Sequence, residues 1–182
     1  MIKAIAMIAD GTEEVECLGV VDILRRAGVQ TALVAVGGKT IVSSHGVTIT
    51  ADKTVDEVDF GDADLIFVAG GLPGTRNLAA CKPLINGIKQ ALSDGRRVAA
   101  ICAAPALVLG ANGFLKGKKA TCYPGFEDNM TGAQIQSSAR VVTDGNVTTA
   151  RGLGCTIELG LELVRLLIGD GQADEIKDKI QF

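Results

Sequence analysis

The chain has 182 residues, a formal net charge of −3 and 47% hydrophobic residues, a length that fits one domain over residues 1–182. Aromatic residues make up only 3% and tryptophan is absent, so valine, isoleucine, leucine and alanine must fill the core, as in buried parallel strands. Lysine and arginine are scattered, which argues against nucleic acid as the main partner. No apolar stretch approaches the ~20 residues of a membrane span, so no membrane association is expected.

Five cysteines occur without paired spacing or a C-x-x-C motif: Cys17, Cys81, Cys102, Cys122 and Cys155. With a single histidine in the chain, we expect no structural zinc site and no other metal. The odd number of cysteines predicts free thiols in a reducing compartment. The first residues lack the basic, apolar and cleavage regions of a signal peptide, so we expect a cytoplasmic protein.

Strands and helices alternate along the chain. Apolar runs predict core strands at 2–9, 29–36, 65–69 and 98–101, and helices at 13–27, 78–92, from Pro105 onward, 156–167 and near the C-terminus. Shorter strands are expected at 41–43, 47–50 and 119–122, and Asp144-Gly145 predicts a hairpin between 141–143 and 147–150. This alternation predicts an α/β fold with a mostly parallel sheet covered on both faces.

In such a sheet, ligands bind beyond the carboxyl ends of the strands. Four segments rich in glycine or functional groups follow predicted strands: Asp10–Glu16, Gly70–Gly74, Cys102–Pro105 and Arg151–Gly154. We therefore expect carboxylates, unencumbered backbone N–H groups, a thiol and an arginine to meet at one edge.

Cys102 carries the most specific signal, because alanines stand two residues before and two residues after it. Small residues at these places are the steric requirement of a nucleophile elbow, a sharp strand-to-helix turn. An elbow would put the thiol at a helix N-terminus and lower its pKa below the ~8.5 of a free cysteine. The alternative is a small buried core cysteine. N–H groups of Gly70, Gly71 and Ala103 could form an oxyanion hole, although a Gly-Gly pair is also a common turn.

Glu13, Glu14 and Glu16 open the first predicted helix, where the helix dipole favours acidic residues. A charged Glu16 beside Cys102 would raise the thiol pKa, whereas a Glu16 kept protonated by burial could donate a hydrogen bond to the thiolate. Any Cys–His catalytic pair would have to use His45, the only histidine. Within one chain, a solvated turn histidine is the simpler interpretation.

The chain resembles the ThiJ/PfpI superfamily, in the branch of the parkinsonism-associated protein deglycase and its bacterial ThiJ-like relatives. The matching segments span the chain: Gly11–Glu16, Val21–Gly28, Gly70-Gly71, Ala99–Pro105 and Arg151–Gly154. The resemblance implies a flavodoxin-like three-layer sandwich and a homodimer. It also implies that Cys102 is a reactive, readily oxidised cysteine, that Glu16 is a protonated carboxyl hydrogen-bonded to it, and that Gly71 and Ala103 are oxyanion donors.

Several positions depart from the family's pattern. Tyr123 replaces a histidine near the nucleophile, Leu153 replaces a common proline, and Ala103 stands where peptidase members carry histidine. His45 aligns with an arginine that reaches the neighbouring subunit's site in the dimeric branch, so it could restore a Cys–His pair across the dimer. Four residues are further candidates for substrate contact or for supporting the site: Gly70, Arg26, Tyr123 and Arg151.

The leading hypothesis is a cofactor-independent enzyme of glyoxalase or deglycase type, a lyase or hydrolase, with Cys102, Glu16 and His45 as catalytic residues. Its expected substrates are methylglyoxal-type α-oxoaldehydes or their protein adducts, which ties it to protection against oxidative stress. The alternative is a non-enzymatic redox sensor or chaperone that works through Cys102 oxidation. A third option, a cysteine peptidase, is disfavoured by Ala103.

Overall fold

Seven strands form the central sheet in the computed structural model, which describes residues 1–182. In spatial order they are β10 (Val141–Asp144), β11 (Val147–Ala150), β7 (Arg97–Ile101), β6 (Leu65–Val68), β1 (Lys3–Ile8), β2 (Gln30–Ala35) and β5 (Lys53–Thr54). Neighbouring strands are parallel except for β10 and β11, which form an antiparallel hairpin. The mostly parallel sheet and the Asp-Gly hairpin predicted from the sequence are confirmed.

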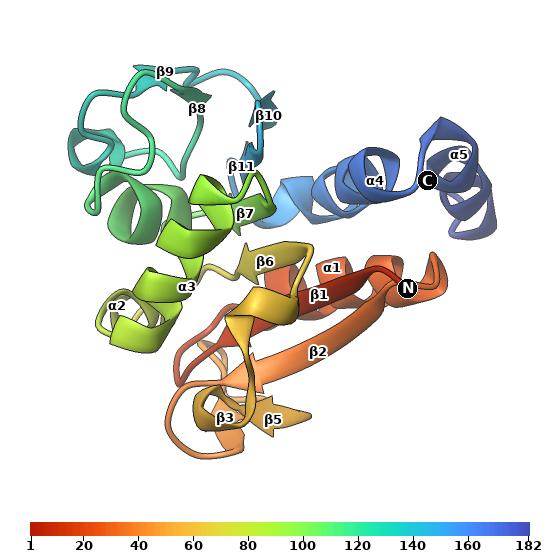
Figure 1. The fold of residues 1–182 in the computed structure, drawn as a ribbon, viewed down its shortest axis with the longest axis horizontal. Helices are drawn as coiled ribbons and strands as arrows, with labels where there is room; N and C mark the ends of the chain where they lie inside the picture. The colour runs from red at the N-terminus through yellow and green to blue at the C-terminus, as the bar shows by residue number, and fades with distance from the viewer.

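Helices cover both faces of this sheet (Figure 1). One face carries α1 (Glu14–Arg26), α4 (Thr156–Leu167) and α5 (Asp170–Lys179), and the other carries α2 (Gly74–Ala79), α3 (Lys82–Ser93) and a π-helix (Pro105–Gly110). Alternate side chains of β1 point to opposite faces, so that Ala6 joins one apolar core and Met7 the other. The flavodoxin-like three-layer α/β sandwich is confirmed.

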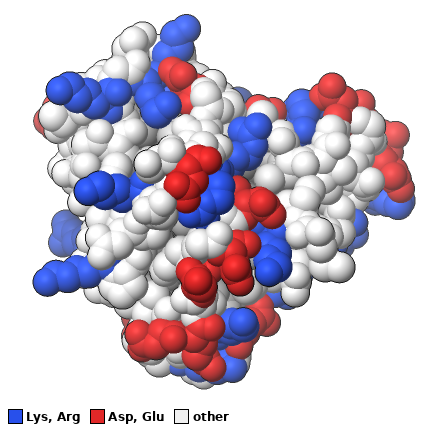
Figure 2. Space-filling model, viewed as in Figure 1, with Lys and Arg blue, Asp and Glu red and all other residues white.

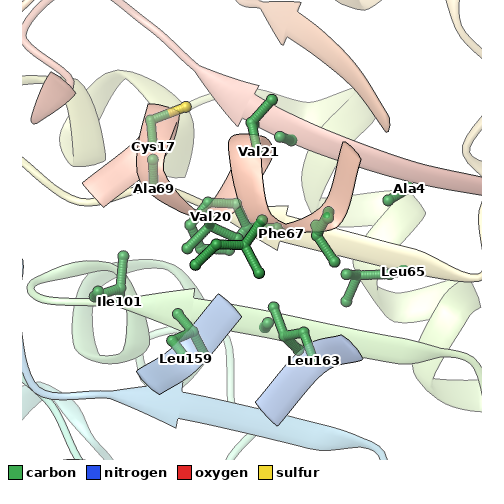
Figure 3. Close-up of a cluster of buried hydrophobic side chains, with 14 of the residues drawn as sticks. Ala4, Cys17, Val20, Val21, Leu65, Phe67, Ala69, Ile101, Leu159 and Leu163 are labelled. Atoms are coloured by element: carbon green, nitrogen blue, oxygen red, sulfur yellow. The ribbon is translucent and has the colours of Figure 1, made fainter. Parts of the chain in front are cut away.

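The packing of α1 against α4 fixes the helix that carries Glu16. Figure 3 shows Val20 of α1 and Leu159 and Leu163 of α4 gathered near the fully buried Phe67 of β6. A glycine lets the two helices approach closely, since a Cβ added at Gly160 would lie 2.7 Å from Ile23 Cδ1. The α1 helix therefore has little freedom to slide along the sheet.

Short elements connect these layers. Strands β3 (Thr40–Val42) and β4 (Thr48–Thr50) pair as an antiparallel ribbon, and β8 (Lys119–Ala120) pairs with β9 (Gln134–Ile135). Single 3₁₀ turns lie at Val55–Glu57, Phe60–Asp62, Glu127–Asn129 and Leu153–Cys155. The ribbon agrees with the prediction, whereas the strand predicted over 119–122 ends at Ala120.

One predicted helix is wrong: residues 78–92 are not continuous, because α2 ends at Ala79 and α3 begins at Lys82. Pro83 gives the reason. Proline has no N–H to donate to the carbonyl of Ala79, and its ring clashes with that carbonyl, so it fits only in the first turn of a new helix. The helix predicted from Pro105 is present, but it is π-helical and ends at Gly110.

Opposite charges are interspersed on the surface. On the face shown in Figure 2, Lys and Arg side chains lie among Asp and Glu side chains, with no broad basic patch. Arg25 pairs with Asp52, and Arg26 pairs with Asp22. None of the helices combines the length and the apolar character that crossing a membrane requires. All five cysteines are unpaired, as predicted.

We expect Gly160→Val to destabilise the chain by about 1–3 kcal/mol, because the new side chain would overpack the α1–α4 contact at Ile23. Urea unfolding at equilibrium measures this change. Gly171→Ala is the matched control, since its added Cβ meets nothing within 4 Å and it lies in α5. Equal stability of the two variants would contradict the proposed tight packing.

Candidate functional site

Cys102 lies in a strained turn directly after β7. Its φ of 65° is one of only two positive values among non-glycine residues, a conformation that costs a side chain free energy. Its N–H donates to the Ala150 carbonyl at 2.9 Å, and its carbonyl accepts from the Tyr123 N–H at 2.7 Å. Ala100 and Ala104 are fully buried around it, as an elbow requires. The structure thus has the geometry of a nucleophile elbow.

Gly70 makes room for the thiol, because a Cβ at this residue would lie 2.6 Å from Cys102 Cβ and would also strike the Glu16 carboxyl. Gly71 adopts φ 90°, and a Cβ there would lie 2.7 Å from the Gly11 carbonyl oxygen. The N–H groups of Gly71 and Ala103 both face the Cys102 sulfur. A side chain at either glycine would therefore overlap neighbouring atoms. The two backbone N–H donors converge on the sulfur.

Glu16, in the first turn of α1, faces Cys102 from the other side. Only 1% of the residue is exposed, and its Oε2 atom is buried without a hydrogen-bond partner. Burial, with a smaller contribution from the charge of Glu13, raises the carboxyl pKa to about 7, although Cys102 and the N–H groups of Gly70 and Leu153 oppose this shift. A protonated Glu16 is thus available as a hydrogen-bond donor near neutral pH.

The expected lowering of the Cys102 pKa is wrong for this chain. Burial, and then the charge of Glu16, raise the pKa of the thiol to about 12, and this outweighs the donors at Gly71 and Ala103. The dipole argument gave too little weight to the burial of the thiol, and the helix after the elbow is a six-residue π-helix. The repulsion by Glu16 disappears once Glu16 is protonated, so the two groups titrate as a coupled pair.

His45 lies in the turn between β3 and β4, over the start of α1. Its Nδ1 atom is 3.4 Å from a Glu14 oxygen, 3.9 Å from a Glu13 oxygen and 3.1 Å from the Ser44 hydroxyl. Its side chain is 69% exposed. The single chain thus places His45 beside two glutamates, and the pairing of His45 with a partner's Cys102 stays a prediction.

Glu13, Glu14 and His45 are also the side chains best placed to hold a metal ion. Their ligand atoms lie within 4.8 Å of one another, although Glu14 and His45 are not buried. Two carboxylate oxygens and one imidazole nitrogen form an incomplete ligand set on the surface. We assign no metal to this cluster.

Tyr123 and Arg151 lie beside the elbow. They line an open cleft of about 310 Å³ together with Pro124 and residues 152–155. The Leu153 backbone in this cleft also faces the Glu16 carboxyl. A larger cleft, of about 670 Å³, is at the opposite edge of the sheet near Lys3 and Gln30. Neither cleft has Cys102 among its lining residues, and the cleft at Tyr123 is the nearer one, since the Tyr123 N–H donates to the Cys102 carbonyl.

Arg26 is not brought to the site. It stands ten residues after Glu16 on α1, about 15 Å along the helix, and its guanidinium pairs with Asp22 at 2.6 Å. The sequence analysis named Glu13 only as a residue that opens the first helix and gave the backbone of Leu153 no role. In the structure the Glu13 carboxylate accepts the Glu16 N–H at 2.7 Å, and the Leu153 backbone faces the Glu16 carboxyl. A backbone donor such as Leu153 leaves no signal in the sequence.

The sheet order and the elbow define a flavodoxin-like α/β protein with a cysteine at the nucleophile position. The model of the DJ-1/PfpI family matches residues 2–166, and the chain belongs to that family.

Similar proteins from several organisms support this family assignment. The chain is 36% identical to the Parkinson disease protein 7 homolog of Danio rerio over 183 aligned positions, which cover 96% of this chain and 94% of that protein. It is 30% identical to a deglycase of Pyrococcus horikoshii over 150 positions, covering 82% and 89% of the two chains. It is 40% identical to DJ-1 homolog B of Arabidopsis thaliana over 175 positions, 96% of this chain, but spans only 40% of that protein.

Solved structures of this family have the same fold as this chain. Oxidised DJ-1 of Toxoplasma gondii superposes with a TM-score of 0.96 at 32% identity, covering 100% of this chain and 99% of that one. DJ-1β of Drosophila melanogaster gives a TM-score of 0.94 at 30% identity, covering 99% and 97%.

We expect Cys102 to be the first cysteine alkylated by limiting iodoacetamide, because it is half-buried whereas the other four cysteines are buried. Since its pKa is raised, the rate should keep rising from pH 7 to pH 10 as the thiolate fraction grows. Mass-spectrometric peptide mapping measures both features. Earlier labelling at Cys122, or a rate that levels off below pH 8.5, would refute this assignment.

Glu16 should make the native chain less stable as pH rises. Its folded-state pKa of about 7 lies above the ordinary 4.5, so the stabilisation from this proton is complete below pH 4.5 and lost as pH rises through 7. The free energy of unfolding of Glu16→Gln, measured relative to that of the unsubstituted chain, should therefore rise by about 2–3 kcal/mol from pH 5 to pH 8. Urea unfolding under reducing conditions measures this, with the exposed Glu175→Gln as control. Parallel pH profiles would count against a buried, neutral Glu16.

Proposed function

We propose that this chain is a cysteine-dependent enzyme of glyoxalase or deglycase type, acting on methylglyoxal-type α-oxoaldehydes or their protein adducts. One observation carries the proposal: the strained Cys102 thiol lies between two backbone N–H donors and a buried carboxyl that exchanges its proton near neutral pH. Similarity to the deglycase of Pyrococcus horikoshii supports the same class of activity.

The first step is addition of sulfur to the aldehyde. Glu16 in its carboxylate form accepts the thiol proton while Cys102 Sγ bonds to the aldehyde carbon. The oxygen that becomes negative accepts hydrogen bonds from the N–H groups of Gly71 and Ala103. Protonated Glu16 then passes its proton to this oxygen, which completes a hemithioacetal and restores the carboxylate.

The second step moves hydrogen between neighbouring carbons. Glu16 removes the proton from the former aldehyde carbon while the ketone oxygen gains a proton, which gives an enediol. The same carboxyl then delivers a proton to the former ketone carbon, and the hydroxyl on the sulfur-bearing carbon loses its proton, which gives a thioester of the hydroxy acid. Water then cleaves the carbon–sulfur bond. One water is consumed and one hydroxy acid is formed, the aldehyde carbon being oxidised and the ketone carbon reduced, so the balance needs no external oxidant or cofactor.

A homodimer is part of this proposal. Apolar side chains are exposed on α1 and on the β3–β4 ribbon, including Val15 at 49% and Val42 at 51%. The ribbon lies against the loop before α1, where the Gly11 N–H donates to the Val42 carbonyl at 2.8 Å. A second copy covering this surface would bring its own His45 toward the partner's elbow.

A redox sensor is the second candidate. The same two N–H donors and the Glu16 carboxyl would stabilise the oxygens of a Cys102 sulfinate. None of the other cysteines is paired with Cys102 in a disulfide, so oxidation need not stop at a sulfur–sulfur bond. An oxidised structure exists for the Toxoplasma gondii relative.

The test is formation of lactate from methylglyoxal, measured without added thiols. Cys102→Ser should abolish it, because the serine hydroxyl is a far weaker nucleophile. Glu16→Gln should reduce kcat by about 10²–10⁴-fold through loss of proton transfer. Cys81→Ser, which changes a buried cysteine outside both the elbow and the cleft at Tyr123, is the matched control. Full activity in Cys102→Ser, or no lactate from the unsubstituted chain, would sink the proposal.

The same assay separates glyoxalase from deglycase. A preformed methylglyoxal adduct of N-acetylarginine is supplied together with excess aminoguanidine, which traps free methylglyoxal. A glyoxalase produces no lactate under these conditions, whereas a deglycase, acting on the adduct itself, still does.

A further inference from the structure

Glu13 is placed to control Glu16, although no step of the proposed reaction uses it. It is the N-cap of α1, and its Oε2 atom accepts the Glu16 N–H at 2.7 Å. Its own N–H donates to the Gly70 carbonyl at 2.9 Å. One residue therefore ties the backbone of Glu16 to the glycine that makes room for Cys102.

Capping alone does not explain a glutamate at this position. Serine, threonine, aspartate and asparagine are the residues favoured at the N-cap, and glutamate is not among them. The difference that glutamate makes here is a carboxylate on a side chain of which only 10% is exposed. Neither lysine nor arginine pairs with it, and the one basic side chain within 4.0 Å is the imidazole of His45, whose Nδ1 lies 3.9 Å from Oε1.

The negative charge of Glu13 therefore acts on the Glu16 carboxyl. The buried Oε2 atom of Glu16 has no hydrogen-bond partner that would stabilise a second negative charge. Ionising Glu16 would put a second carboxylate beside the first, and the charge of Glu13 accordingly adds to the upward shift of the Glu16 pKa. The other titratable groups that face this pair are Glu14 and Cys17 on α1, His45 on the ribbon and Cys102 on the elbow.

We propose that Glu13 is a positioning residue: its carboxylate fixes the backbone of Glu16, and its buried negative charge acts on the Glu16 carboxyl that faces Cys102. This inference rests on the proposed function only in that Glu16 is the proton carrier of that reaction. The charge coupling itself belongs to the resting protein and does not require turnover.

The test follows the titration of Glu16 directly, through the infrared carbonyl band of its protonated carboxyl, identified by difference against Glu16→Gln. Glu13→Gln removes the charge and keeps an oxygen that can accept the Glu16 N–H. We expect the midpoint of the Glu16 titration to fall by about half a pH unit or more. Glu14→Gln is the matched control, because Glu14 is one residue further on and its carboxylate turns toward Ser44 and His45. It should move the midpoint much less.

A double-mutant cycle separates coupling from structural damage. The pH profile of Cys102 alkylation should shift in Glu13→Gln, and the shift should shrink when Glu16→Gln is already present. Glu13→Asn, which puts a favoured N-cap residue in place of the charge, serves if Glu13→Gln fails to fold. An unmoved Glu16 midpoint, an equal shift in Glu14→Gln, or an alkylation shift that persists without Glu16 would overturn the proposal. Failure of lactate formation would leave these outcomes unaffected.

Discussion

The site depends on one steric constraint: Gly70, Cys102 and Glu16 meet in a space that no further side chain can enter. A Cβ at Gly70 would overlap both Cys102 and Glu16, and the elbow itself holds Cys102 at φ 65°. Such strain persists only where the surroundings over-determine it. Here the hydrogen bonds of the Cys102 backbone to Ala150 and Tyr123 do so. The sheet edge, the helix α1 and the hairpin strand are thus all required to hold one thiol in place.

Much of the fold could be predicted because its signals are local. Uninterrupted apolar runs indicated β1, β2, β6 and β7, and an Asp-Gly pair indicated the β10–β11 turn. The split between α2 and α3 was missed because the apolar periodicity continues through the break, and the proline that causes it is also common in the first turn of a helix. The π-helical form over Pro105–Gly110 was not predicted either, because π-helices are rare and the apolar pattern after Pro105 does not distinguish them from α-helices.

The groups that meet around Cys102 were predictable from the sequence, but the pKa of its thiol was not. Small residues around Cys102 and the glycines before α2 indicated which groups meet. The thiol pKa depends instead on a balance between burial, two N–H donors and a carboxylate brought from another element, and its sign follows from distances that only the fold sets. Arg26 illustrates the same limit, because membership of a matching segment does not bring a side chain ten residues along a helix to the site.

The reactivity of this thiol therefore rests on where one proton resides. With Glu16 ionised, the carboxylate repels a thiolate, yet the same carboxylate is a base that can take the thiol proton during attack. With Glu16 protonated, the repulsion is gone and a donor faces the sulfur. Because the Glu16 pKa is about 7, both forms are populated near neutrality. If Glu16 were less buried, its pKa would fall and the carboxyl would stay charged at neutral pH. If it were more buried, its pKa would rise and the carboxyl would stay protonated and could not accept a proton. The depth at which α1 places Glu16 thus sets the chemistry available to Cys102.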